Sequence, residues 1–367
     1  MGAAATDPRQ REDVLPPAAT RSLKIWLWIV LLAVLAMIAL GGATRLLGAG
    51  LSITEWRPIT GILPPIHEED WNAAFQSYQE IPQFKLINHR MSLAQFKVIF
   101  FWEYAHRLLG RVVGLLYLVP FLFFWQRKAF PTGRVRAFSV PLVLLGLQGF
   151  LGWYMVKSGL SQRTEVSQYR LAAHLSLALV LLGYLHWQIR ALQIPGMLIR
   201  GWFSRRTSVA SGLLFLVGLQ VVVGAFVAGT RAGYGYPTFP KMTGHWLHPD
   251  AFRLTPTWLN FFENPAMLQW LHRSLGWLLL FTALGVLSWA LRRLSGPIRR
   301  SYLNWVFLVA LQFALGVAAL LSGMNVALAI LHQLNAALLW LATLVILAEA
   351  KAPSLSNQVL AGKKKAE

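Results

Sequence analysis

The chain has 367 residues, of which 56% are hydrophobic and 13% charged, and its mean hydropathy is +0.50. The charged share is about half of the roughly 25% typical of soluble proteins, which argues against a soluble enzyme and a disordered chain. The chain has no cysteine, which excludes disulfides, thiolate metal sites, thiol catalysis and covalent haem attachment through C-x-x-C-H. Any metal would be held by histidine or carboxylate, or carried in a porphyrin.

Eight apolar segments follow one another, each long enough to cross a hydrocarbon core about 30 Å thick. They are too long and too continuous for barrel strands of about 10 alternating residues. Helix-start signals support this interpretation, because Ser92 and Gln95 form a capping-box pattern and Asn264 precedes Pro265. We therefore predict an all-α integral membrane protein with eight transmembrane helices. The segments are expected at about 25–44, 98–125, 137–156, 170–190, 208–229, 265–291, 301–321 and 326–349.

The basic residues are concentrated in alternate connections. Of the 34 Lys and Arg residues, 20 lie in the five connections on one side, four in each. The positive-inside rule makes that side cytoplasmic and places both termini there. The net charge of +20 is thus mainly a topology signal, and nucleic-acid binding is not expected. These residues are Arg9, Arg11, Arg21, Lys24, Arg127, Lys128, Arg134, Arg136, Arg190, Arg200, Arg205, Arg206, Arg292, Arg293, Arg299, Arg300, Lys351, Lys363, Lys364 and Lys365.

The eight segments divide into two four-helix bundles with long outer loops rich in aromatic residues, Pro and Gly. The expected parts are a cytoplasmic tail 1–24, an N-terminal bundle 25–195 with outer loop 45–97, a C-terminal bundle 196–350 with outer loop 230–264, and a basic cytoplasmic tail 351–367. The loops are expected to be ordered and to lie along the membrane. Candidate interfacial anchors in them are Trp56, Trp71, Trp246 and Trp258.

A four-helix repeat relates the two bundles. His-Arg pairs recur in segments 2 and 6, Leu-Gln pairs in segments 3 and 7, a histidine in segments 4 and 8, and Thr-Arg at the ends of segments 1 and 5. Four helices per repeat give both halves the same orientation across the membrane. The corresponding residues are His106-Arg107 and His272-Arg273, Leu147-Gln148 and Leu311-Gln312, His174 and His332, and Thr44-Arg45 and Thr230-Arg231.

Four of the nine histidines therefore lie inside predicted helices: His106, His174, His272 and His332. A lone histidine there can serve packing, but four at repeated positions favour a function because each is costly to insert. Two at similar depth on neighbouring helices can hold a planar macrocycle through an imidazole on each face. A proton or ion pathway and a bare metal site are the alternatives, although a relay usually has several carboxylates and a metal site a third ligand. The other histidines are His186, expected at the cytoplasmic interface, and the outer-loop residues His67, His89, His245 and His248.

Glu103 is the one clearly intramembrane carboxylate, and Gln269 stands at its place in the second half. It shares a helix face with His106 and can pair with Arg107, four residues on. Such a carboxylate can also act as a base or stabilise a cationic intermediate. Its absence from the second half suggests one reactive site and one site that only carries electrons. Four repeated arginines can bind haem propionates or, at the outer end, lipid headgroups: Arg45, Arg107, Arg231 and Arg273.

These residues resemble the haem A synthase family over nearly the whole chain. The specific stretches are Gly41-Gly42-Ala43-Thr44-Arg45, Gly50-Leu51-Ser52-Ile53-Thr54-Glu55-Trp56, Pro58-Ile59-Thr60-Gly61, Trp102-Glu103-Tyr104-Ala105-His106-Arg107 and Leu271-His272-Arg273. The sequence is most similar to the α-proteobacterial and mitochondrial branch. The other branch has an outer-loop cysteine pair that is missing here.

The resemblance implies oxidation of the C8 methyl group of haem O to a formyl group, giving haem A for terminal oxidases. It implies a b-type haem on His272 and His332, substrate haem near His106 and His174, and Glu103 as the essential carboxylate. A haem O synthase is the expected upstream partner and the cell inner membrane the expected location. A quinone-linked dihaem cytochrome b and a transporter with a histidine relay remain the alternative functions.

Overall fold

The computed structural model describes residues 17–57, 60–131, 133–160, 164–193 and 207–351. Most of the two predicted tails, the motif residues Pro58 and Ile59, and part of the connection after segment 4 lie outside this range. Several basic residues used to predict topology are also outside the described residues: Arg9, Arg11, Arg200, Arg205, Arg206, Lys363, Lys364 and Lys365.

Eight long apolar helices form the described part of the chain, as predicted, and each can cross a membrane by length and composition. Their ends lie within a few residues of the expected ones, except that the first helix begins earlier. The helices are α2 (Pro17–Leu46), α4 (Leu93–Gln126), α5 (Val135–Gly159), α6 (Gln168–Ala191), α7 (Ser208–Gly229), α10 (Pro265–Arg293), α11 (Gly296–Leu321) and α12 (Val326–Lys351).

The helix ends follow the predicted local signals. Ser92 accepts from the Gln95 backbone while the Gln95 side chain accepts from the Ser92 backbone, which completes the capping box of α4. Asn264 Oδ1 accepts from Ala266 N, 2.9 Å away, at the start of α10. Gly323 follows α11 with φ +67°, a backbone conformation that glycine adopts without steric cost.

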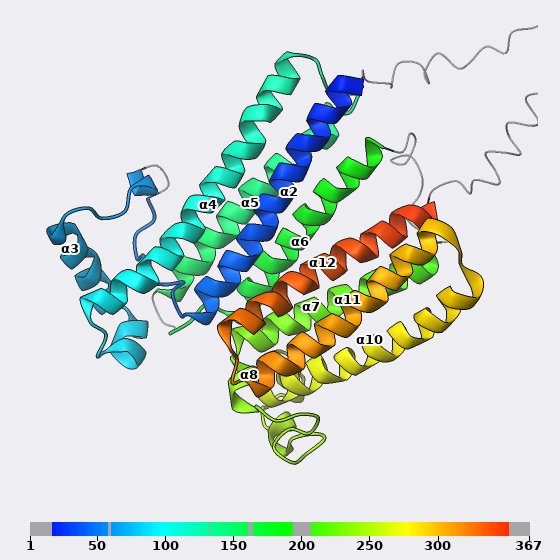
Figure 1. Ribbon diagram of the computed structural model, residues 1–367. Helices are drawn as coiled ribbons and strands as arrows, with labels where there is room; N and C mark the ends of the chain where they lie inside the picture. Colours follow the sequence, from blue (N-terminus) through cyan, green and yellow to red (C-terminus); the bar gives the residue numbers. More distant parts are fainter. Residues whose placement is uncertain (1–16, 58–59, 132, 161–163, 194–206, 352–367) are drawn as a thin grey trace, which may run out of the picture.

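The helices form two groups, each with its own apolar core (Figure 1). One core lies mainly among α2, α4, α5 and α6 and includes Ala337 of α12, and the other lies among α7, α10, α11 and α12. The groups meet where α2 and α6 contact α12, and where α6 contacts α7. The described ends of the first and last helices lie at the same end of the molecule (Figure 1). The four-helix repeat that relates the two groups stays a prediction, as does the placement of both termini on the cytoplasmic side.

The first outer loop forms a small domain between α2 and α4. It contains α3 (Glu68–Gln79) and a π-helical turn at Phe84–Asn88, and its core includes Tyr78 and Trp71. Trp71 was expected as an interfacial anchor; this was wrong, because its ring packs against Phe100 with only 7% of the residue exposed. The other three candidate anchors are exposed: Trp56, Trp246 and Trp258. The second outer loop contains the short helices α8 (Ala232–Gly235) and α9 (Asn260–Glu263) and two 3₁₀ turns, Pro249–Phe252 and Thr257–Leu259.

Candidate functional site

Each of the four intramembrane histidines packs against a glycine on a neighbouring helix. The imidazoles are partly buried, and the glycines give the rings the room that a side chain would fill. A Cβ atom would lie only 2.8 to 3.0 Å from the ring Cε1 atom at Gly41, Gly224 and Gly316, which is closer than ordinary contact, whereas at Gly152 the distance of 3.6 Å is an ordinary contact. The pairs are His106 with Gly41, His174 with Gly152, His272 with Gly224, and His332 with Gly316.

His272 and His332 face each other across the second helix group. Their ring centroids are 6.3 Å apart and the rings are inclined by 77°. Two imidazoles on opposite faces of one iron, with bonds about 2 Å long and ring centres about 1 Å beyond the nitrogen, would have centroids roughly 6 Å apart. This pair therefore fits the axial ligand set of a haem.

The ring nitrogens of the four histidines have different surroundings. The Nδ1 atoms of His106, His174 and His272 are inaccessible and have no hydrogen-bond partner among the described residues. No hydrogen bond to Nδ1 therefore fixes the tautomer of these three rings. In His332, Nδ1 lies 3.1 Å from the carbonyl oxygen of Gln312. With a proton on Nδ1, which donates to the carbonyl, the Nε2 lone pair faces the amide nitrogen of Gln312, 3.2 Å away.

Amide side chains support the histidine-bearing helices, and sequence analysis gave them no role. Gln148 and Gln220 donate to the backbone carbonyls of His174 and His272, at 3.2 and 3.0 Å. The Gln312 amide nitrogen lies within 3.2 Å of both His332 ring nitrogens. Its oxygen accepts from Asn335 at 2.8 Å. The available signal was an amide within an otherwise apolar helix, where it needs a hydrogen-bond partner.

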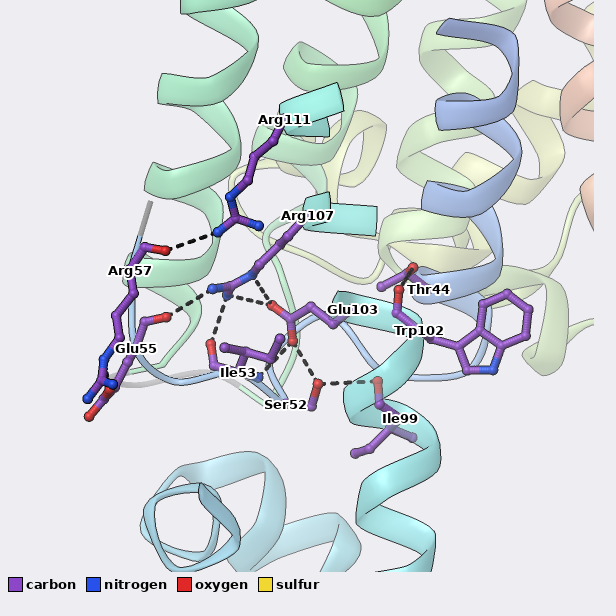
Figure 2. A network of polar contacts seen from close by, with 10 residues as sticks. All are labelled: Thr44, Ser52, Ile53, Glu55, Arg57, Ile99, Trp102, Glu103, Arg107 and Arg111. Atoms are coloured by element: carbon purple, nitrogen blue, oxygen red, sulfur yellow. Dashed lines mark hydrogen bonds and ion pairs between the residues drawn. The ribbon is translucent and has the colours of Figure 1, made fainter. Parts of the chain in front are cut away.

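Glu103 is buried, with 3% of the residue exposed, and forms the centre of a polar network (Figure 2). One carboxylate oxygen accepts from Ser52 Oγ and from the backbone N–H of Ile53, both at 2.8 Å. The other accepts from two nitrogens of Arg107, at 2.6 and 3.0 Å. The pairing with Arg107 predicted from the sequence is confirmed. Both oxygens are therefore engaged, and the carboxylate fastens the start of the outer loop to α4.

Arg107 and Arg273 make similar contacts in the two helix groups. Arg107 donates to the carbonyls of Ile53 and Glu55 and lies over the Trp56 ring. Arg273 donates to the carbonyls of Tyr236 and Pro240 and lies over the Phe239 ring. Each arginine thus holds the outer loop of its own group. The two helix groups differ in the charge of the residue near the arginine. The first group has the carboxylate Glu103, whereas the second has the buried, uncharged Gln269 at the corresponding position.

Arg45 and Arg231 converge on one carboxylate, Glu165, in the connection between α5 and α6. Arg45 reaches Glu165 at 2.9 Å and also donates to the carbonyl of Ala228, near the end of α7, at 2.7 Å. This cluster links the two groups at their outer ends. Glu165 was not predicted from the sequence, because it lies 120 positions from Arg45 in a connection without a recognisable motif.

The remaining histidines do not form a metal site with three ligands. His245 and His248 have ring centroids 5.9 Å apart, but His248 Nδ1 accepts from the backbone of Asp250. His186, expected at the interface, is buried with 5% exposed. No group of three or more His, Cys, Asp or Glu residues in the described parts of the chain can hold a metal ion.

Eight apolar helices that hold four histidines against glycines define a polytopic membrane protein with sites suited to haem. Comparison with known proteins matches residues 24–344 to COX15-CtaA, the cytochrome oxidase assembly protein family. The match spans most of the chain, and the chain therefore belongs to this family.

Similar curated proteins bear the name heme A synthase. The one from Paracoccus denitrificans is 43% identical over 328 residues, which cover 88% of this chain and 86% of the relative. The one from Nitrosospira multiformis is 42% identical over 336 residues, covering 89% and 93%. The one from Rhodopseudomonas palustris is 44% identical over 321 residues, covering 87% and 86%.

Proposed function

We propose that this protein acts as a haem A synthase, oxidising the C8 methyl group of haem O to a formyl group. Its family and its relatives of that name support the reaction. The observation that carries the proposal is the pair His272 and His332, 6.3 Å apart with a glycine beside each ring. The enzyme is thus an oxidoreductase that acts on a C–H bond of a porphyrin substituent.

His272 and His332 would hold a resident b-type haem, which supplies one-electron redox chemistry when bound. The backbone carbonyl of Gln312 can hold the His332 ring through Nδ1, whereas the Gln312 amide nitrogen lies 3.2 Å from Nε2 and would have to move for Nε2 to bind iron. Arg273 ties the loop residues Tyr236 and Pro240 to the helix that carries His272. Because its guanidinium can also bind a carboxylate, it stays a candidate for a haem propionate.

His106 and His174 would bind the substrate haem in the first half. A glycine lies beside each ring, and at Gly41 a side chain would come too close to His106, as at both glycines of the second half. Arg107 and Arg45 are the candidates for the substrate propionates. In the structure each already has an acidic partner, Glu103 and Glu165, so a propionate would share or exchange that contact.

Glu103 is the candidate for the essential carboxylate. Its two oxygens are held in place by donors from Ser52, Ile53 and Arg107. A carboxylate in this position can stabilise positive charge that develops on the substrate, or accept a proton. The second half has Gln269 there, which has no charge and cannot serve either role. This difference supports placing the reaction in the first half.

The setting follows from the reaction. Haem O and haem A are hydrophobic, and eight membrane helices suit an enzyme that takes haem O from the bilayer and releases haem A into it. The proposed location is the cell inner membrane. The proposed upstream partner is a haem O synthase, and the product would go to a terminal oxidase during its assembly.

Expression with a haem O synthase tests the function directly. Haems are extracted from the purified protein and from membranes, and identified by chromatography and mass. Haem A is the expected product, with haem B also present in the purified protein. Haem B alone would indicate a dihaem electron-transfer protein instead, and the absence of any haem would favour a transporter with a histidine relay.

A further inference from the structure

Two adjacent glycines of α2, Gly41 and Gly42, receive side chains from the two different helix groups. His106 of the same group packs on Gly41. Gln333 of α12 lies on Gly42, so closely that a Cβ atom there would overlap its amide oxygen. The Gln333 amide nitrogen donates to the carbonyl of Ile38, 2.8 Å away. One turn of α2 thus contacts both groups.

Gln333 directly follows His332, one of the two candidate haem ligands of the second half. The two candidate sites are therefore joined by a short chain of contacts. It runs from His332 to Gln333, across to Gly42 and Gly41, and on to the ring of His106. A shift of α12 along α2 would move His332 relative to the turn of α2 on which His106 packs.

The corresponding positions elsewhere in the fold are apolar. Gly224, which receives His272 as Gly41 receives His106, is followed by the buried residue Ala225. His174 is followed by Leu175, which packs against the first core. The amide and its glycine are therefore specific to the contact between α2 and α12. An amide in an apolar helix needs a partner, and a backbone carbonyl of the other group provides it.

We propose that Gln333 is a positioning residue that sets the register of the His332 helix against the turn of α2 carrying His106. Gly42 is the second part of this device, because its missing side chain makes room for the amide. The effect of this register on haem chemistry rests on the proposed function. The packing register of α12 against α2 is independent of that function.

The first test measures the register without haem or activity. Because the chain has no cysteine, nitroxide labels can be placed on Leu32→Cys of α2 and Leu338→Cys of α12, two exposed positions. Pulsed electron–electron double resonance of the labelled protein in nanodiscs should show a narrow distribution of distances between the two labels. Gln333→Met, of similar length but without the donor, should broaden or shift it. The matched control Leu175→Met should leave it unchanged. An unchanged distribution in Gln333→Met would overturn the proposal.

The second test measures catalysis by the holoenzyme. Gln333→Met and Gly42→Ala should each keep the b-type spectrum and lower kcat for haem A formation at least fivefold, with KM for haem O within twofold. The double variant Gly42→Ala/Gln333→Leu reproduces the Ala225 and Leu175 side chains and should remain slow. Full activity in the double variant would show that the contact only fills space, and would contradict a positioning role. If the wild type itself forms no haem A, the proposed function fails while the label measurement still decides the register.

Discussion

Replacing Glu103 by glutamine tests the reactive half most sharply, because the change keeps the shape of the side chain. It converts the first half to the residue of the second half, Gln269. The carboxylate has four donors around it, from Ser52, Ile53 and Arg107. A carboxamide offers one acceptor oxygen, and its NH₂ group must face one of these donors.

The cost follows from the burial of the pair. Glu103 is 3% exposed and the Arg107 side chain 11%. Removing one partner of a buried ion pair costs about 3–5 kcal/mol. Arg107 keeps two backbone carbonyls, so the lower value of about 3 kcal/mol applies. At about 1.4 kcal/mol per factor of ten, the loop at 52–56 should open roughly 100 times more often.

Hydrogen exchange of the peptide that covers residues 52–57, read by mass spectrometry, measures this opening. Ser52→Ala removes one donor and keeps the carboxylate, so about 1 kcal/mol and roughly fivefold faster exchange are expected. Haem A formation separates the two roles of Glu103. If the carboxylate acts in the reaction, Glu103→Gln abolishes haem A while Ser52→Ala keeps most of it. Unchanged exchange in Glu103→Gln would refute the structural reasoning, and normal haem A output would refute the catalytic assignment.

Two further variants test the close packing of a glycine against His332 and the contact between the helix groups. Gly316→Ala would place Cβ 2.8 Å from His332 and should reduce bound b-type haem at least tenfold in the absorption spectrum. Gly285→Ala, where a Cβ atom meets nothing within 4 Å, should leave the spectrum intact. A loss of bound haem in both variants would contradict the role given to the glycine beside His332. Glu165→Gln weakens two ion pairs and should lower the free energy of unfolding by about 1–2 kcal/mol. A loss of this size lowers the thermal unfolding midpoint by a few degrees. The exposed pair of Glu80 provides the control, since Glu80→Gln should have no measurable effect.

Local features were predictable from the sequence where a single helix determines them. The eight spans follow from apolar length, and the ends near Ser92 and Asn264 follow from capping chemistry. The pairing of Glu103 and Arg107 follows from the spacing of four residues on one helix. These relations depend on neighbours in the chain, which the sequence shows directly.

Contacts between distant segments were beyond the sequence. Composition does not distinguish an aromatic residue at the membrane interface from one in a loop core, so Trp71 was misplaced. Arg45 has its acidic partner 120 positions away, and Gln333 donates to a carbonyl 295 positions away. Such pairs form only when the two helix groups pack together. The repeated histidines were visible without this information, because an ionisable group in an apolar segment is itself unusual.

The absorption spectrum of the purified protein tests directly which histidine pair holds the resident haem and which binds the substrate haem. We predict a low-spin b-type haem that is lost in His272→Ala and in His332→Ala. The same spectrum should persist in His106→Ala and His174→Ala, which should instead form no haem A. Loss of the tightly bound haem in His106→Ala, together with its retention in His272→Ala, would contradict the account.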